Sequence, residues 1–420
     1  MLRHPLVESL LSLRGNVRAC VYTEPLWGIP FNLYAPYVSV YMRELGLIDT
    51  QIGLLITLGW ILQIFTALLS GPITDRLGRK RATLIFDLIS WSVPTLIWAL
   101  AQNFYWFLAA ALFNSLWRIT MTSWNCLLVE DADPQQLVDI YAWVHIAGLL
   151  SAFFAPLAGL LINAFSLVPT MRGLYLLAFV LMTIKFIWLN AIVTETKQGR
   201  IRMLETKTQS LFSMLSGYRA VFGQVLRTPS TLYTLGIMLV MSICMMINST
   251  FWSLLVTERL LIPPEHIAIY PFAKSSLMLV FFFLVLPRFR ELPFRYPMLL
   301  GFACFVLSQL LLITIPEKSY LLLLAATFLE ACGAASVNPQ MDRLTVVTVD
   351  PKERARITSL LYVTVIMLAS PFGWIAGSLS SINRILPFSL NIILFLIGGL
   401  LVFLAARSAD RLRQRLAASQ

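Results

Sequence analysis

The sequence predicts an all-α membrane protein whose twelve transmembrane helices form two parallel-repeat six-helix bundles. The first observation behind this fold class is composition: of 420 residues, 58% are hydrophobic and 13% are charged. Soluble chains carry about a quarter charged residues, so the bilayer must be the solvent for most of this protein's outer surface. The other two observations are the recurrence of apolar stretches along the chain and a repeat that divides them into two sets of six.

Each apolar stretch is about twenty residues long, enough to cross about 30 Å of hydrocarbon. We place the spans of the first half at 21–42, 50–70, 82–102, 105–128, 140–164 and 172–194. We place those of the second half at 231–256, 266–286, 296–315, 319–342, 356–379 and 386–406. The predicted domains are an N-terminal bundle (1–195), a polar cytoplasmic linker (196–230) and a C-terminal bundle (231–420).

The repeat that supports this division lies around the fourth and tenth spans. Asp133-Pro134 follows the fourth span and Asp350-Pro351 follows the tenth, and the next span in each half contains a proline-glycine break. Six spans return the chain to the side where it began, so the two halves share one orientation. Parallel repeats of this kind are typical of transporters whose two bundles move about a site near the middle of the membrane.

Positive charge indicates how the chain lies in the membrane. Lys and Arg gather before the first span, in the loop 71–81, in the linker, at 288–295, at 343–356 and after 406. Cytoplasmic loops are enriched in these residues, so we expect a multi-pass protein of the inner membrane with both termini in the cytoplasm. The net charge of +11 follows from the same bias, and we expect contact with membrane lipid and no nucleic-acid partner.

The sequence contains no pattern typical of a metal or cofactor site. Its five cysteines lie far apart, without a CxxC pair or a Cys/His cluster, so neither a metal centre nor a disulfide framework is expected. A loop of the GxxxxGK[ST] kind, which binds nucleotide phosphates, is also missing from the sequence. We therefore expect no cofactor and no ATP-driven step. A membrane enzyme would need a nucleophile or a metal cluster, and none is visible.

The loop between the second and third spans carries the most specific motif, GPITDRLGRKR from Gly71 to Arg81. Gly71 and Gly78 allow a tight turn and a close approach of helices, and Asp75 carries a charge suited to a helix N-terminus. The motif resembles the signature loop of the major facilitator superfamily, of the bacterial twelve-helix type. That signature reads glycine, three residues, Asp-Arg, one residue, Gly-Arg and further basic residues.

The resemblance implies a gating role for this loop. In the family the loop aspartate latches the two halves on the cytoplasmic side, and the loop arginine pairs with an acid after the fourth span. Here that acid would be Glu130 or Asp131. The expected gating residues are Gly71, Asp75, Arg76, Gly78, Arg79, Glu130 and Asp131. The corresponding loop of the second half, 287–293, keeps its basic charge but has lost the motif.

Six ionisable residues lie within predicted spans, where each costs about 2.5–3.5 kcal/mol at a helix centre. They are Glu24, Asp87, Arg118, Lys185, Lys274 and Glu330. The resemblance implies a cavity lined by the first, fourth, seventh and tenth spans, which favours Glu24, Arg118 and Glu330. We expect Arg118 to pair with Glu24, with Glu330 or with an anionic substrate. We expect Lys185 to extend toward the outer interface and Asp87 to join the cluster around Arg79.

Helical spacing places aromatic and amide side chains beside these charges. The expected substrate and coupling cavity is formed by Glu24, Trp27, Arg118, Trp124, Asn125, Asn248, Trp252, Glu330 and Asn338. Such a lining can hold an organic solute. Pro25, Gly28, Pro30 and Pro36 make the first span irregular, which membranes tolerate where the backbone faces a cavity. The alternative is that the charges pair with one another and only hold helices together.

These patterns and the resemblance together predict a secondary active transporter that moves a small organic solute by alternating access. The resemblance and the buried carboxylates Glu24 and Glu330 imply that transport is coupled to protons. The solute and the direction stay open, and a drug or metabolite efflux pump working as a proton antiporter is the alternative. A non-transporting membrane receptor is a further alternative, although such relatives usually add soluble domains. We expect the protein to work as a monomer.

Overall fold

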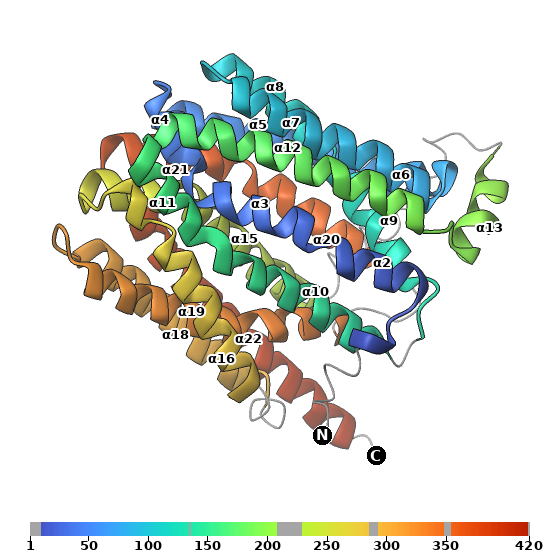
Figure 1. Ribbon diagram of the computed structural model, residues 1–420. Coiled ribbons are helices and arrows are strands. Elements are labelled where there is room, and N and C mark those ends of the chain that lie inside the picture. The colour runs from blue at the N-terminus through green and yellow to red at the C-terminus, as the bar shows by residue number, and fades with distance from the viewer. Residues whose placement is uncertain (1–9, 134–135, 208–228, 285–292, 348–353, 419–420) are drawn as a thin grey trace, which may run out of the picture. The chain divides into compact units, whose positions relative to one another are not determined.

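The computed structural model describes residues 10–133, 136–207, 229–284, 293–347 and 354–418. Within these ranges every regular element is a helix and none is a strand (Figure 1). The chain divides into two compact units. Unit 1 comprises Met1–Leu47 and Leu58–Ser216, and unit 2 comprises Ile48–Thr57 and Gly217–Gln420. The predicted all-α membrane fold is confirmed.

Unit 1 contains the helices of the first half of the chain. In order they are α2 (Gly15–Thr23), α3 (Pro25–Tyr34), η1 (Ala35–Tyr37), α4 (Val38–Glu44), α5 (Asp49–Leu77), α6 (Arg79–Asp87), η2 (Leu88–Ser92), α7 (Val93–Leu100), α8 (Phe104–Asn114), α9 (Trp117–Val129), α10 (Leu137–Ser151), η4 (Ala152–Phe154), α11 (Ala155–Phe165), α12 (Leu167–Ile192) and α13 (Lys197–Thr206). Helix α3 lies beside α12, α10 and α11 (Figure 1). The first turns of α5 belong to unit 2.

Unit 2 contains the helices of the second half. They are α15 (Pro229–Leu254), η6 (Leu255–Arg259), η7 (Pro264–His266), α16 (Ile269–Leu284), α18 (Arg295–Thr314), α19 (Tyr320–Val347), α20 (Arg354–Ala369), α21 (Pro371–Ile382) and α22 (Leu386–Ala418). A core of buried apolar residues from α15, α18, α19 and α22 holds them together, with the rings of Phe305 and Phe395 stacked at 4.7 Å. Helices α18 and α19 approach closely because Gly301 and Gly333 face each other's backbone.

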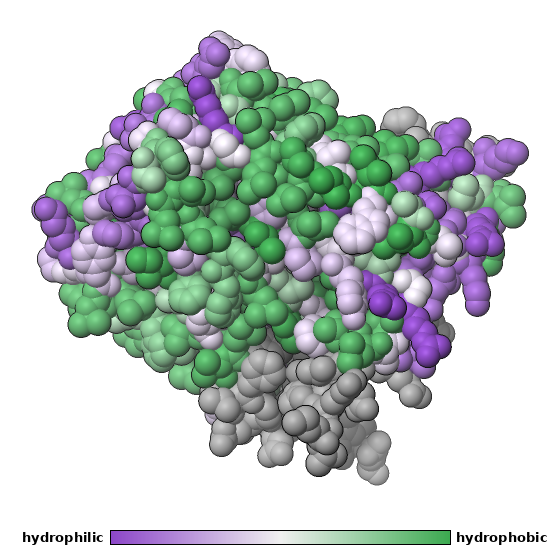
Figure 2. Space-filling model, viewed as in Figure 1, coloured by the Kyte–Doolittle hydropathy of each residue, from purple (hydrophilic) through white to green (hydrophobic). Residues whose placement is uncertain are grey.

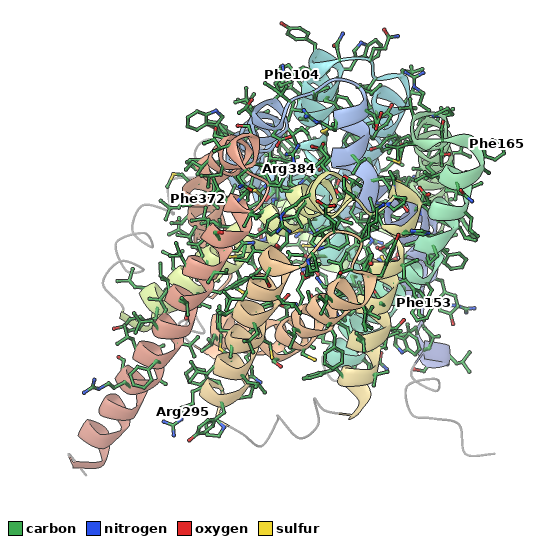
Figure 3. All side chains as sticks on the ribbon, turned by 90° about the vertical axis from the view of Figure 1, so that its left-hand side faces the viewer. Phe104, Phe153, Phe165, Arg295, Phe372 and Arg384 are labelled. Atoms are coloured by element: carbon green, nitrogen blue, oxygen red, sulfur yellow. The ribbon has the colours of Figure 1, made fainter. Side chains whose placement is uncertain are left out.

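The start of α5 also packs closely on α21, with Gly53 of α5 against Gly373 of α21. A Cβ on Gly53 would meet the carbonyl oxygen of Gly373, so only glycine permits this approach. The hydroxyl of Thr57 donates to the carbonyl of Ser370 at 2.8 Å. Arg384, labelled in Figure 3, lies in the turn between α21 and α22 and forms ion pairs with Asp49 and Glu258. These contacts explain why residues 48–57 belong to unit 2.

Several breaks in the helices lie next to a proline, which lacks a backbone N–H. The first predicted span is irregular, as expected, because Pro25 begins α3 and Pro36 lies in η1. Breaks also precede Pro156 and Pro371. The fourth predicted span is interrupted at Ser115, whose freed carbonyl accepts a hydrogen bond from Thr66 at 2.8 Å.

Nine helices in the described ranges are long and apolar enough to cross a membrane, so the chain is a multi-pass membrane protein. The first and fourth predicted spans are each divided into shorter helices. The eighth corresponds to α16, whose described part ends at Leu284. The predicted linker is partly helical, since α13 lies within it. The predicted loop 287–293 and the repeat positions 134, 350 and 351 fall wholly or largely outside the described residues.

The outer surface fits a lipid environment. On the face shown in Figure 2, hydrophobic residues cover the middle of the helices and hydrophilic residues gather near their ends. Phe153 and Phe165 project outward from η4 and α11 (Figure 3) and are exposed. Apolar surface of this extent would be unfavourable in water, so these helices are suited to contact with hydrocarbon.

Candidate functional site

Unit 1 contains an open cavity of about 390 Å³. Its walls come from α3, α6, η2, α9 and α12, together with the junction of α2 and α3. The lining residues are Glu24, Trp27, Phe31, Asp87, Trp91, Trp117, Thr120, Met121, Trp124 and Lys185. Five aromatic rings and three ionisable groups therefore surround one space inside a membrane-spanning bundle.

Local breaks in the backbone place two of these side chains. Glu24 occupies the junction of α2 and α3, where Pro25 cannot donate a backbone hydrogen bond, and the N–H of Glu24 donates to the carbonyl of Val21 at 3.3 Å instead. Trp91 lies in η2, a single π-helical turn that follows Asp87. Such turns often occur at functional sites because they redirect side chains. The side-chain amide of Asn114 donates to the carbonyl of Ser90 in η2 at 2.8 Å.

The central charge pair joins α12 to the start of α3. Lys185 Nζ donates to Glu24 Oε2 at 2.8 Å, and the side chains are 5% and 15% exposed. The expectation that Lys185 extends toward the outer interface is therefore wrong. An ammonium group in the middle of a membrane helix needs a nearby counter-charge, and the carboxylate of Glu24 supplies it.

Asp87 brings a second carboxylate to the same cavity. It is 3% exposed and lines the cavity with Glu24 and Lys185. The expectation that it belongs to the cluster around Arg79 is wrong, because it lies at the opposite end of α6 from that residue. Lys185 therefore shares the cavity with two carboxylates, the buried Asp87 and the half-buried Glu24.

Aromatic rings surround this pair. Trp27 and Phe31 are stacked with centroids 4.8 Å apart, and Trp91 meets Trp27 edge-on at 5.1 Å. The Lys185 ammonium lies 5.9 Å from the Trp27 ring and 5.8 Å from the Trp124 ring, within the range of cation–π attraction. The indole Nε1 of Trp124 is buried and has no hydrogen-bond acceptor among the described residues.

Arg118 lies beside this cavity on α9. Its Nε donates to Gln63 Oε1 at 2.9 Å, and its guanidinium stacks on the Trp117 ring at 4.2 Å. The two carboxylates expected as its partners form ion pairs with lysines, Glu24 with Lys185 and Glu330 with Lys274.

The structure brings together only part of the predicted cavity set. Glu24, Trp27 and Trp124 line the cavity, whereas Asn125 accepts a hydrogen bond from the Tyr141 hydroxyl at 2.9 Å. Asp87 and Lys185 are the members that sequence reasoning placed elsewhere. Both residues could have been recognised in the sequence as charges within apolar spans. They lie on α6 and α12, however, and the resemblance favoured other spans.

The other predicted residues belong to unit 2. Glu330 on α19 accepts from Lys274 on α16 at 2.6 Å. Asn248 accepts from the side chain of the fully buried Asn391 at 3.0 Å, and Trp252 meets Tyr270 edge-on at 5.6 Å. Asn338 is half-buried on α19.

The expected gating loop forms a buried network at the start of α6. Arg79, 4% exposed, pairs with Asp75 at 2.9 Å and with Glu130 at 3.0 Å. The acid after the fourth span is therefore Glu130. Asp131 accepts from the backbone N–H of Lys197 at 3.3 Å instead. Arg76 is exposed.

The same network contains a carboxylate that the sequence analysis did not single out. Glu195, after α12, accepts from the backbone N–H groups of Arg79 at 2.9 Å and Lys80 at 3.1 Å. It thereby caps the N-terminus of α6, where unpaired N–H groups favour an anion. The hydroxyl of Thr196 donates to Glu130 and links the start of α13 to the end of α9.

The two loop glycines differ in role. Gly78 has a φ of 83°, and a Cβ there would lie 2.6 Å from Glu195 Oε2, so the turn requires glycine. Gly71 lies inside α5, and no described atom would come within 4 Å of a Cβ on it. The expected tight turn and close approach are both found at Gly78, and neither is found at Gly71 among the described residues.

Comparisons with known proteins agree with this architecture. A family model described as Major Facilitator Superfamily matches residues 28–290. No curated protein matches the chain.

Solved structures of transporters resemble the whole chain. The nucleoside transporter NupG has a TM-score of 0.69 at 15% identity, covering 94% of this chain and 99% of its own. A POT family transporter in complex with a thioalcohol-conjugated peptide has a TM-score of 0.71 at 14% identity, covering 96% and 99%. The human organic anion transporter MFSD10 (TETRAN) has a TM-score of 0.67 at 16% identity, covering 95% and 100%. At these identities the likeness concerns the fold.

Proposed function

The chain belongs to the major facilitator superfamily, and we propose that it moves a small organic solute through the unit 1 cavity by alternating access coupled to protons. As a member of that family it is a membrane transporter and not an enzyme. The observation that carries the proposal is the buried ion pair between Glu24 and Lys185 in a cavity that also holds Asp87.

The balance of charge inside the cavity supports proton coupling. Two carboxylates face one lysine, so one negative charge is left without a counter-charge in the lining. A buried carboxylate of this kind is stabilised when it binds a proton or a cation. Protonation would change the attraction that Lys185 feels from each acid, and this gives a link between proton binding and the packing of α3, α6 and α12.

The aromatic walls support an organic solute. Pockets of about 300–1,000 Å³ lined by aromatic residues with a few polar groups are typical of small-molecule sites. The solved relatives are named for nucleosides, peptides and organic anions. That variety assigns no solute to this chain, so its chemistry must be read from its own cavity.

The basic loop network supports a cytoplasmic position for the start of α6. We place the chain in the inner membrane with both termini in the cytoplasm, following the positive-inside rule. The network around Arg79 joins α5, α6, α9 and the start of α13 within unit 1. In this proposal it holds that end of the bundle rigid while access to the cavity changes, and the protein acts as a monomer.

Counterflow in proteoliposomes tests the assignment of the cavity. Vesicles containing the purified protein are loaded with one unlabelled solute at a time from a panel of amines, amino acids, nucleosides and carboxylates, and uptake of the labelled solute is recorded. We expect at least one solute to exchange, and Glu24→Gln to abolish that exchange. Glu205→Gln is the matched control, because Glu205 is half-exposed on α13, where it forms an ion pair with Arg202. Normal exchange by Glu24→Gln would contradict the assignment.

A further inference from the structure

We propose that the solute of the unit 1 cavity is an organic cation, an amine or quaternary ammonium compound with a flat apolar body, which competes with a proton for Asp87. The inference rests on the proposed function and names its substrate class. It is carried by three features of the described residues: the charges of the lining, the aromatic walls and an indole N–H without an acceptor.

The charged residues of the lining favour the binding of one additional positive charge. When both are ionised, Glu24 and Asp87 carry two negative charges, and Lys185 is the only cationic group among the lining residues. Lys185 is bound to Glu24 at 2.8 Å, so Asp87 is the carboxylate left to receive a ligand. A cation that enters this cavity balances the remaining charge, whereas an anion would add a third negative charge to it.

Arg118 is the other cation near the cavity. It is not among the lining residues, its Nε is bound to Gln63, and its guanidinium is stacked on Trp117. The Trp117 ring, which does line the cavity, already interacts with a cation through one of its faces. Its Nη1 lies 3.9 Å from the sulfur of Met121, so Arg118 contacts two lining residues, Trp117 and Met121, without lining the cavity itself. We therefore count it as a cation held beside the cavity and not as a ligand for an anionic solute.

The aromatic walls already hold an ammonium group. Lys185 Nζ lies 5.9 Å from the ring centroid of Trp27 and 5.8 Å from that of Trp124, and both residues line the cavity. Desolvated cation–π contacts contribute about 2 kcal/mol, and the quadrupole of each ring favours positive charge over negative. Because Trp27 and Trp124 also line the cavity, an aromatic wall of this kind favours a second, mobile ammonium over an anion.

The unpaired indole N–H adds a requirement on the rest of the solute. Trp124 lines the cavity, and its Nε1 is buried with no acceptor among the described residues. A buried donor left without an acceptor costs about 1–3 kcal/mol. An ether, hydroxyl or carbonyl oxygen on the solute would satisfy it.

Competition between solute and proton follows from the same charge balance. Asp87 is faced by Lys185 from α12, by Glu24 from the start of α3, by the Cys20 thiol from α2 and by Thr120 from α9. Without a bound cation, a proton on Asp87 neutralises the remaining charge. When an organic cation binds, Asp87 gives up that proton to solution, so one positive charge enters as another leaves. This favours exchange of the solute for a proton over transport of both together.

The test compares three probes of one shape and different charge. Binding of 3-phenylpropylamine, 3-phenylpropanol and 3-phenylpropanoate to the purified full chain is measured by calorimetry, and proton release is measured in weak buffer with a pH dye. We expect the amine to bind at least about tenfold more tightly than the other two, because a charge-assisted contact is lost in each. We also expect one proton released per amine bound, and weaker amine binding as pH falls.

Two variants test which cavity residues bind the amine, so the conclusion does not depend on either variant alone folding correctly. Asp87→Asn should weaken amine binding by about tenfold or more and abolish proton release, and Trp124→Phe should weaken binding of amines that carry an oxygen acceptor. Glu205→Gln and Trp106→Phe, at exposed positions, are the matched controls. The wild-type comparison of the three probes needs no variant at all.

The outcomes separate this inference from the function on which it rests. Tightest binding of the carboxylate would overturn the cation assignment and point to Lys185 and Arg118 as an anion site. Equal binding of all three probes, or binding of none, would also overturn it. If another solute still shows counterflow that requires Glu24, the proposed transport function stands and only the substrate class fails.

Discussion

At the scale of single residues, the decisive feature is a lysine in the middle of a membrane helix. Lys185 is buried, and its counter-ion Glu24 lies 161 positions earlier in the sequence. The sequence marks both residues as unusual, because charges within apolar spans need a reason. It cannot show that they meet, since helical periodicity describes one helix and not which faces of two helices come together. Asp87 was misplaced for the same reason.

The Lys185–Glu24 pair predicts a specific pattern of stabilities. Removing one member leaves an uncompensated buried charge, which typically costs about 3–5 kcal/mol. Lys185→Met should therefore lower the thermal midpoint of the purified protein, and so should Glu24→Gln to a smaller extent. The double variant should recover most of the loss because neither member of the pair is left without its partner, yet it should not transport. Thermal unfolding followed by light scattering measures this. Additive losses in the double variant would show that the two side chains do not interact.

At the scale of elements, the breaks in helices position the cavity. The junction at Pro25 holds Glu24, and the π-helical turn η2 holds Trp91. Sequence analysis could predict the first break, because proline has no backbone N–H. It did not predict η2, although Pro94 follows that turn and has no N–H for the carbonyl of Ser90 four residues earlier. That carbonyl accepts from the side chain of Asn114 instead, a contact that the sequence alone does not show.

The loop between α5 and α6 offers a comparison of two glycines of one motif. Gly78→Ala should destabilise the protein by about 1 kcal/mol or more, because the residue must adopt a positive φ and its Cβ would press on Glu195. Gly71→Ala should be neutral or stabilising by up to about 1 kcal/mol, because alanine favours a helix and nothing described lies near that Cβ. Thermal unfolding of the two variants compares them directly. Equal losses would mean that Gly71 has a packing role outside the contacts described.

At the scale of the whole molecule, much of the architecture follows from hydropathy and charge alone. All twelve predicted spans are largely helical over the residues described, and nine described helices can cross a membrane unaided. The location of the cavity was predicted less well. The resemblance pointed to the first, fourth, seventh and tenth spans, whereas the cavity in unit 1 also takes Asp87, Trp91 and Lys185 from the third and sixth. Which polar side chains share a space depends on tertiary packing, and one sequence does not encode that in its periodicity.

The central claim, that this transporter couples solute movement to a proton on a cavity carboxylate, is tested most directly by accumulation driven by a pH gradient. Proteoliposomes with a solute that shows counterflow are given a pH gradient, and solute is followed in the wild type, in Asp87→Asn and in Glu205→Gln. The account predicts accumulation against the solute gradient by the wild type and by Glu205→Gln. It predicts that Asp87→Asn loses accumulation but keeps some counterflow, because exchange of solute needs no net proton movement. The account would be contradicted if Asp87→Asn accumulated as much solute as the wild type. It would also be contradicted if the pH gradient did not change accumulation by the wild type.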